Sequence, residues 1–361
     1  MSEFTEKSRS WSYHRQLLGK RATWADKALR EIVGVSGLNQ AGALSLRARV
    51  KSFDAKNFLE LDCKRLALRI TGMRRAVYMV PAENAGAVFS ATAADSQSPL
   101  SRNMRTGPSA LDKKYRDLRE MVEKVAISPL SPVEIADAIG IPFRNIRPVI
   151  SRMTSEGRLL AVGSKSIHSN CLSYVSARSW SDRFAPVERR KALTWLAAEY
   201  IRAFGPVRIK DYRWWAGTTP DCAIGSFMEN DIAEIESGYF ILKNDLPSYD
   251  RFRQQEFETV DLLPLCDPYI TGYAPDGRER FVDRKFQTRI FGKVPPTIEQ
   301  GVVLVNGTAK GTWNYGFVGG KMIVYLKMFV EGTGRLNSAI NEELNQVAEL
   351  FQVKSMVVRA R

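Results

Sequence analysis

The 361-residue sequence has few of the residues that build metal sites and disulfide frameworks. It contains two histidines, His14 and His168. Its four cysteines stand far apart, at Cys63, Cys171, Cys222 and Cys266. Such a set excludes a zinc site built on paired cysteines and a multi-histidine catalytic centre. We therefore expect no bound metal, and cysteines that pack as small buried side chains in a reducing compartment.

Long apolar runs are also missing. No segment approaches the ~18 consecutive apolar residues of a membrane span, and the N-terminal MSEFTEKSRS has no apolar signal core. With 44% apolar and 10% aromatic residues, the chain can nevertheless bury sizeable cores. At roughly 100–200 residues per domain, the sequence predicts a cytoplasmic protein of two to four domains with no membrane partner.

Acidic residues are scarce relative to basic ones. The chain has 53 Lys and Arg against 39 Asp and Glu, a net charge of +14, and residues 1–120 hold 22 basic and 12 acidic side chains of this total. A positive field concentrated in one third of the chain favours a polyanion, and DNA or RNA is the commonest one. The alternative is a charge surplus that only keeps the protein soluble.

Helices followed by a hairpin recur along the first 256 residues. In the first part, the pattern predicts helices over 13–33, 41–50 and 55–61 and strands over 66–70 and 76–80, with a basic turn between the strands. Asp54 is the expected N-cap of the third helix. This order is typical of a winged helix. Residues 92–114 are rich in Ser, Pro, Gly and charge, and predict a linker or flexible loop.

Two more units of this kind follow. In the middle one, Ser131 begins a short helix and residues 143–156 form the second helix of a helix-turn-helix, before two strands. Pro148 should kink or shorten that second helix. The next unit is predicted to contain helices over 193–204, 209–216 and 220–229 and a closing strand over 239–244, with Gly217 ending the second helix.

After about residue 258 the pattern changes to short strands. Strand-like runs separated by turn residues include VDLLPLCD, ERFVD, QTRIFG, GVVLVNG, AKGTWNY and KMIVYLKMFV. Asn306-Gly307 predicts a hairpin, and the spacing indicates a small barrel or sandwich followed by a helix over 336–350. The whole chain is predicted to be α+β, with three tandem winged-helix units and a C-terminal small β-barrel. The predicted boundaries are 1–110 with the loop, 111–182, 183–256, and 257–361 for the barrel and closing helix.

Common catalytic motifs are absent. GFVGGK resembles part of a phosphate loop, but Tyr315 stands at the first glycine position and Met322 where Ser or Thr is needed. This segment is better interpreted as a hairpin turn. Neither a G-x-S-x-G elbow nor an H-E-x-x-H zinc motif occurs.

Four segments carry a resemblance to a known family. In chain order they read MRRAVYMVPAENAG, AEYIRAFGPVRIKDYRWWAG, VDLLPLCDPYITGY and GVVLVNGTAKGTW. They resemble motifs of the AlkZ-like winged-helix DNA glycosylases, and the resemblance extends from about Leu17 to Phe351. It implies three winged-helix units and a β-barrel that form a basic cradle around duplex DNA. It also implies hydrolysis of the N-glycosidic bond of N7-alkylated guanine, in some members with interstrand crosslinks as substrates, in DNA repair or antibiotic self-resistance.

The catalytic signature that the resemblance implies is Gln-x-Gln or Gln-x-Asp after a Gly-Leu. The matching stretch here is VGVSGLNQ, residues 33–40. One register puts Leu38 and Gln40 in the two signature positions, and the other puts Ser36 and Leu38 there, so neither gives Gln-x-Gln. Only the first register keeps one amide, Gln40, with Asn39 as a neighbouring substitute. The hairpin histidine of the family is replaced by Tyr78. Asn39 and Gln40 are therefore the candidate catalytic residues, and the alternative is that both only start the following helix.

The basic clusters of the first unit are candidate phosphate contacts. These residues are Arg47, Arg49, Lys51, Arg74, Arg75, Arg102 and Arg105. Two functions remain open. One is a DNA glycosylase acting on alkylated or crosslinked guanine, and the other is a non-catalytic DNA-binding protein, such as a regulator or damage sensor. In both, duplex DNA is the partner, and neither a cofactor nor an obligatory protein partner is expected.

Overall fold

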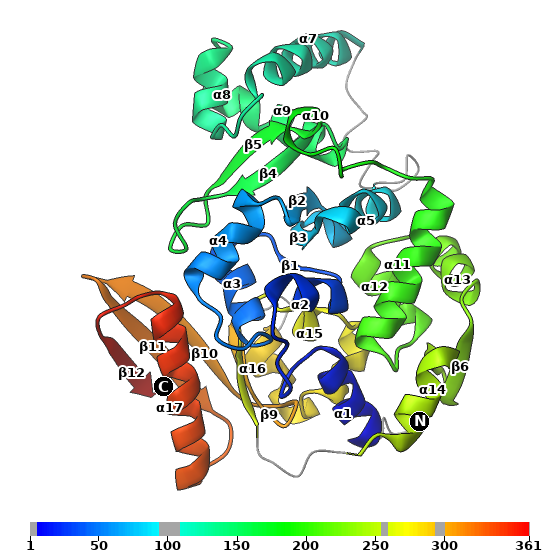
Figure 1. The fold of residues 1–361 in the computed structure, drawn as a ribbon, viewed down its shortest axis with the longest axis vertical. Coiled ribbons are helices and arrows are strands. Elements are labelled where there is room, and N and C mark those ends of the chain that lie inside the picture. Colours follow the sequence, from blue (N-terminus) through cyan, green and yellow to red (C-terminus); the bar gives the residue numbers. More distant parts are fainter. Residues whose placement is uncertain (1–5, 94–108, 254–258, 293–299, 361) are drawn as a thin grey trace.

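The computed structural model describes residues 6–93, 109–253, 259–292 and 300–360. We refer to four segments: the first (6–93), second (109–182) and third (183–253) segments and the C-terminal segment (259–360). In Figure 1 the second segment lies at the top, the first in the centre, the third at the right, and strands β10–β12 with helix α17 at the left. None of the helices in the described ranges has the length and apolar character of a membrane span.

The first segment differs from its prediction near the start. One helix was expected over 13–33, but there are two, because the chain turns at Leu17 (φ 57°) and Gly19 (φ 71°). Asp54 caps the fourth helix as expected, in a capping box with Asn57. The elements are α1 (Glu6–Arg15), α2 (Ala25–Glu31), β1 (Val35–Ser36), α3 (Asn39–Arg47), α4 (Ala55–Cys63), β2 (Ala67–Thr71), η1 (Met73–Arg75), β3 (Val77–Pro81), η2 (Ala82–Asn84) and α5 (Ala85–Thr92).

In the second segment, Ser131 begins a helix with a capping box to Glu134, as the sequence predicts. Pro148 does not shorten the next helix, which continues through it to Ser155. The elements are α7 (Ser109–Val125), α8 (Pro132–Ala138), α9 (Phe143–Ser155), β4 (Leu159–Gly163), β5 (Leu172–Ser176) and α10 (Ala177–Trp180).

The third segment follows its prediction closely. Gly217, with a φ of 72°, ends one helix in the left-handed conformation that glycine adopts most readily. The elements are α11 (Arg189–Phe204), α12 (Ile209–Ala216), α13 (Pro220–Met228), β6 (Ile232–Glu236), β7 (Tyr239–Leu242), η3 (Lys243–Asp245) and α14 (Leu246–Arg251). Helices followed by an antiparallel strand pair thus occur three times along the chain. Their interpretation as winged helices stays a prediction.

The C-terminal segment is an open sheet with a helix, not the predicted barrel. Its strand order is β12-β11-β10-β9-β8, so β8 and β12 are edges, and β12 runs parallel to β11. The Asn306-Gly307 hairpin is present between β9 and β10. The elements are β8 (Val260–Leu263), α15 (Pro268–Thr271), η4 (Pro275–Arg280), η5 (Arg284–Phe286), α16 (Gln287–Phe291), β9 (Gly301–Val305), β10 (Thr308–Val318), β11 (Lys321–Met328), α17 (Gly334–Leu350) and β12 (Met356–Ala360).

Two predicted strands of this segment are not strands. ERFVD lies in and after the 3-10 turn η4, and QTRIFG forms the short helix α16. Their apolar side chains, including Phe281 and Ile290, are fully buried in the core. A short apolar run can fill a core either as a helix or as a strand, so its periodicity alone does not distinguish a helix from a strand.

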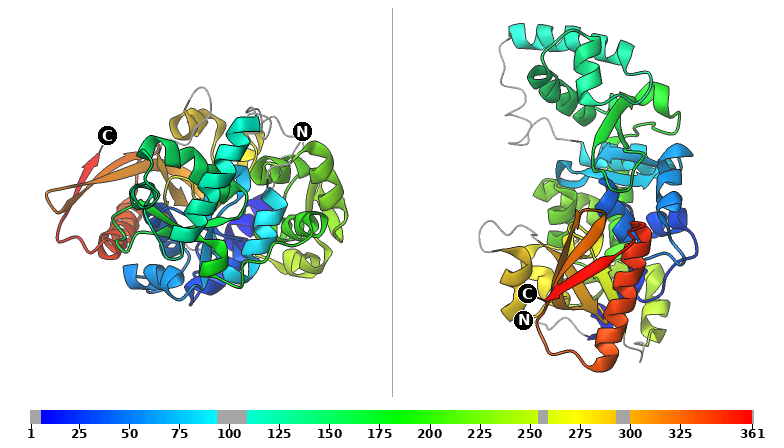
Figure 2. Two further views of the ribbon diagram at one scale, coloured as in Figure 1. Left: turned by 90° about the horizontal axis from the view of Figure 1, so that it is seen from above. Right: turned by 90° about the vertical axis from the view of Figure 1, so that its left-hand side faces the viewer.

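A second sheet joins the first two segments. Its strand order is β1-β3-β2-β4-β5, and β2 meets β4 at Arg69 and Ala161. The hairpin of the second segment therefore extends the sheet of the first, and the right-hand view of Figure 2 shows the second segment at that end of the molecule. This pairing brings the loop between β4 and β5 to the first segment.

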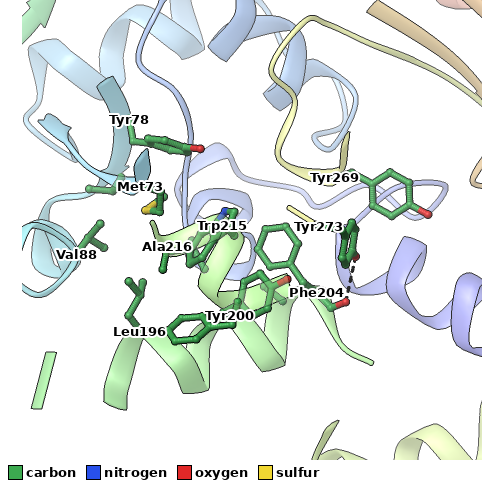
Figure 3. Packing of buried hydrophobic residues seen from close by; sticks show 14 of the residues in the cluster. Met73, Tyr78, Val88, Leu196, Tyr200, Phe204, Trp215, Ala216, Tyr269 and Tyr273 are labelled. Atoms are coloured by element: carbon green, nitrogen blue, oxygen red, sulfur yellow. Dashed lines mark hydrogen bonds between the residues drawn. The ribbon is translucent and has the colours of Figure 1, made fainter. Parts of the chain in front are cut away.

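Aromatic side chains connect the third segment to the C-terminal one. Tyr200 stacks on Phe204 at a ring-centroid distance of 4.8 Å and lies 4.9 Å from Trp215. The Tyr273 hydroxyl donates a hydrogen bond of 3.0 Å to the carbonyl of Phe204 (Figure 3).

The expectation that the cysteines are buried is wrong for three of the four. The exposed ones are Cys63, Cys171 and Cys266.

Candidate functional site

The candidate catalytic residues lie at the start of helix α3. The preceding strand β1 pairs with β3, where Ser36 is opposite Tyr78. The chain then turns through Gly37 and Leu38, and the helix begins at Asn39. The segment that resembles the family signature is thus held between a strand and a helix N-terminus.

Gln40 is half-buried, and its amide is fixed at both ends. Its Nε2 donates a hydrogen bond of 2.6 Å to the carbonyl of His168, and its Oε1 accepts one of 3.2 Å from the Tyr315 hydroxyl. Its backbone N–H donates to Asn170 Oδ1 at 3.1 Å. Burial raises the pKa of Tyr315, which keeps that hydroxyl protonated as the donor. Only one of the two Nε2 hydrogens is used by these bonds.

Asn39 is placed differently. It is 1% exposed, and its Nδ2 donates two hydrogen bonds of 2.9 Å, to the carbonyls of Ser164 and Ser166. Both amide hydrogens are therefore occupied, and the Oδ1 is buried without a hydrogen-bond partner. The expectation that Asn39 assists catalysis is not supported by this position, because the side chain is sealed from solvent and holds a loop.

Beside Asn39 lies a buried ion pair. Arg69 donates to both carboxylate oxygens of Asp62, at 3.2 and 2.6 Å, and to the carbonyl of Gly37 at 2.5 Å. The last bond fixes the turn that precedes Gln40. These bonds satisfy the buried guanidinium and make the start of α3 rigid.

The loop between β4 and β5, residues 164–171, supplies most of the partners of Asn39 and Gln40. It is anchored by Ile167, which is 5% exposed and packs in the core cluster that also contains Ala43 and Val324. The His168 ring lies 5.0 Å from Phe317, edge to face. This loop and His168 were not predicted as neighbours of the candidate segment. One apolar residue in a polar hairpin loop was the signal available.

Two of the proposed phosphate-binding arginines are buried. Arg47 is 2% exposed and forms an ion pair of 2.8 Å with Glu343. Arg49 is fully buried and pairs with both oxygens of Asp267, at 2.7 and 2.8 Å. The expectation that these two side chains contact DNA is wrong for this structure, since their charges are neutralised inside the protein.

The remaining candidates are distributed unevenly. Lys51 is exposed beyond the end of α3, Arg74 is exposed at the tip of the β2–β3 hairpin, and Arg75 beside it is half-buried. The hairpin tip packs on α12, where the Arg74 guanidinium lies 5.3 Å from the centroid of the Trp214 ring. Arg102 and Arg105 lie outside the described residues.

We searched the described side chains for groups that could bind a metal ion. Over 6–93, 109–253, 259–292 and 300–360, no three His, Cys, Asp or Glu side chains come together as ligands for a metal ion. The groups that form hydrogen bonds with Gln40 are the Asn170 amide, the His168 carbonyl and the Tyr315 hydroxyl.

Comparison with known proteins decides the family. The sequence model of a family described as "DNA glycosylase AlkZ-like" matches residues 34–350. The chain belongs to the AlkZ-like DNA glycosylase family. It is thus of the DNA glycosylase type, and DNA is the molecule that this family binds.

The fold agrees with this family. Among solved structures, the Streptomyces sahachiroi DNA glycosylase AlkZ is similar, with a TM-score of 0.77, 17% sequence identity and 98% of each chain covered. At this identity the similarity establishes the fold. None of the curated proteins compared with the chain matches it.

Proposed function

We propose that this AlkZ-like protein is a DNA glycosylase that removes N7-alkylated or crosslinked guanine from duplex DNA. The observation that supports this proposal is the fixed amide of Gln40, held by the His168 carbonyl and the Tyr315 hydroxyl at 2.6 and 3.2 Å. A polar group held in place before the reaction costs no reorganisation during it. Gln40 is the residue we assign to positioning the attacking water.

The chemistry asks little of the protein beyond this positioning. A guanine alkylated at N7 is already cationic, so it leaves without a general acid. The sugar then carries oxocarbenium-like charge, which polar groups and a positioned water stabilise. A carboxamide cannot donate a proton as an acid at neutral pH, so neutral bases such as uracil and 8-oxoguanine should not be released.

DNA binding by this chain is supported by its net charge of +14 and by the exposed basic residues Lys51 and Arg74. We assign these two, with the half-buried Arg75, to phosphate contacts. Binding of this kind is insensitive to sequence and weakens with salt.

The second candidate function is binding to damaged DNA without catalysis. It is favoured by a specific observation. Asn39 is buried, and the backbone N–H, one Nε2 hydrogen and the Oε1 of Gln40 form hydrogen bonds within the protein. A residue used in this way can be retained for structure alone. The same fold would then serve as a sensor.

The deciding experiment is incubation with duplex DNA that contains 7-methylguanine, followed by heat to cleave abasic sites. We expect cleavage by the parent protein, and a rate lower by about 10²–10³ in Gln40→Ala, the usual effect of losing one preorganised polar group. Gln287→Ala, a half-buried glutamine at the start of α16, is the control and should keep the parent rate. If the parent binds this duplex but no alkylated duplex is cleaved, the sensor function holds instead.

A further inference from the structure

Asn39, the neighbour of Gln40, is a polar side chain that joins two parts of the chain far apart in the sequence. Its two Nδ2 hydrogen bonds, each of 2.9 Å, end on main-chain carbonyls of the loop between β4 and β5, at Ser164 and Ser166. These acceptors follow Asn39 by 125 and 127 residues. Burying an amide is costly unless such bonds form. Asn39 therefore ties the first segment to the second at the start of α3.

The same loop holds Gln40. The His168 carbonyl accepts from the Gln40 Nε2 at 2.6 Å, and the Asn170 Oδ1 accepts from the Gln40 backbone N–H at 3.1 Å. Asn39 binds the loop two and four positions before His168. Inside the loop, the backbone N–H of His168 donates to the Ser166 Oγ at 3.3 Å. A residue fixed by Asn39 is thus bonded directly to the residue that orients the Gln40 amide.

Arg69 supports Asn39 from the sheet that joins the two segments. It lies on β2 where this strand pairs with β4, and its bonds to Asp62 and to the Gly37 carbonyl keep its guanidinium in place. At Gly163, the last residue of β4, a Cβ would meet this guanidinium well inside van der Waals contact and the Asn39 Oδ1 at 2.5 Å. The absence of a side chain at Gly163 therefore lets Asn39 and Arg69 pack together against the strand end that leads into the loop.

We propose that Asn39 is a positioning residue, which acts through the β4–β5 loop to hold the Gln40 amide in its productive orientation. A residue that only began helix α3 would need neither deep burial nor bonds to a loop of another segment. Displacement of a catalytic group by about 1 Å can cost about 10²-fold in rate, so small movements of this loop matter. This inference rests on the proposed role of Gln40 and adds to it a residue that is itself sealed from solvent.

The test uses Asn39→Ala, which removes both donors and introduces no new contact, in the excision assay on duplex DNA containing 7-methylguanine. We expect the single-turnover rate to fall by about 10- to 100-fold. The dissociation constant for the duplex should stay that of the parent, because no charged or exposed group has changed. A weaker affinity with an unchanged single-turnover rate would contradict the proposal.

A double-mutant cycle with Gln40→Ala shows whether Asn39 acts through Gln40. Adding Asn39→Ala to Gln40→Ala should lower the rate no further, since a residue that only positions Gln40 has no effect once that amide is gone. If the two rate losses multiplied instead, Asn39 would act independently of Gln40 and the proposal would be overturned.

Hydrogen exchange supplies a readout that does not depend on catalysis. The backbone N–H of Gln40 is bound by Asn170 in the loop, so in Asn39→Ala it should exchange faster than in the parent. The N–H of Leu44, further along α3, should exchange as in the parent. Equal acceleration at both positions would indicate a general loosening of the helix and would count against the proposal.

Gly163→Ala disturbs the same contact from the opposite side and serves as the second variant. Its Cβ displaces Asn39 or Arg69, and the guanidinium cannot retreat without breaking its bonds to Asp62. We expect a similar fall in excision rate with unchanged DNA affinity. Gly225→Ala in α13 is the matched control, because a Cβ there would meet nothing within 4 Å. It should keep the parent rate.

The outcomes separate this inference from the proposed function. If the parent excises no alkylated guanine, the proposed function fails, and a role of Asn39 in the reaction fails with it. If the parent is active and Gln40→Ala is slow, but Asn39→Ala and Gly163→Ala both keep the parent rate, the positioning role is refuted while the proposed function stands.

Discussion

Replacing Arg49 should lower the stability of the fold and leave the affinity for DNA unchanged. The Arg49 guanidinium lies fully buried and donates to Asp267, to the carbonyls of Gln16 and Ser45, both at 2.9 Å, and more weakly to Gln16 Oε1. Asp267 is equally buried and also accepts a hydrogen bond of 2.9 Å from the backbone N–H of Tyr269. Arg49→Met leaves this carboxylate charged and unpaired inside the protein.

The cost of breaking one side of such a pair is about 3–5 kcal/mol. At roughly 2–4 °C per kcal/mol for a large domain, this predicts a melting temperature lower by roughly 6–20 °C. Arg49→Met with Asp267→Asn should be more stable than Arg49→Met alone, because the orphaned charge is gone. DNA affinity, measured well below the melting temperature, should equal that of the parent.

Thermal unfolding and a salt titration of DNA binding together check this reasoning. If Arg49→Met melted with the parent but bound DNA more weakly and with a flatter salt slope, the buried assignment of Arg49 would be refuted. Such a result would return this residue to the phosphate-binding surface.

Three further predictions follow from other buried contacts. Burial raises the pKa of Asp261 to about 6, above its value of about 3.9 in the unfolded chain, so the folded protein loses stability as the pH rises from about 4 to 6. In urea unfolding, Asp261→Asn should not show this loss, and by pH 7 its free energy of unfolding should exceed that of the parent by up to about 3 kcal/mol. Ile167→Ala should weaken the packing of the loop against the core by about 2–5 kcal/mol and therefore speed tryptic cleavage after the exposed Lys165. An unchanged cleavage rate would show that Ile167 does not anchor the loop. Gly307→Ala should lower the melting temperature, since φ is 74° and a Cβ would meet the Tyr13 ring at 3.0 Å; a variant as stable as the parent would contradict this.

Local signals in the sequence predicted the local structure well. The caps at Asp54 and Ser131, the helix end at Gly217 and the Asn306-Gly307 hairpin are all present. Each depends on hydrogen bonds or backbone angles within a few residues, which a short stretch of sequence determines. The order of helices and hairpins could be predicted for the same reason.

The environment of the arginines could not be predicted in this way. Arg47 and Arg49 lie on and just after a helix with basic spacing, and nothing nearby shows whether they face water or another segment. Their partners, Glu343 and Asp267, lie more than 200 residues away in the sequence. The missing barrel has a similar cause, because closure depends on how the edge strands β8 and β12 meet and not on any one strand.

The surroundings of Gln40 also determine at which stage of protein synthesis the site can form. The Gln40 amide is oriented by His168 and Tyr315, which follow it by 128 and 275 residues. During synthesis the first segment leaves the ribosome long before either partner, and domains generally fold in that order. A nascent or truncated chain therefore carries Gln40 without its orientation, and the activity that we propose for Gln40 would begin only when β10 has been made and docked. Substitutions far from Gln40 that loosen this docking should act as losses of function without any change at the residue itself.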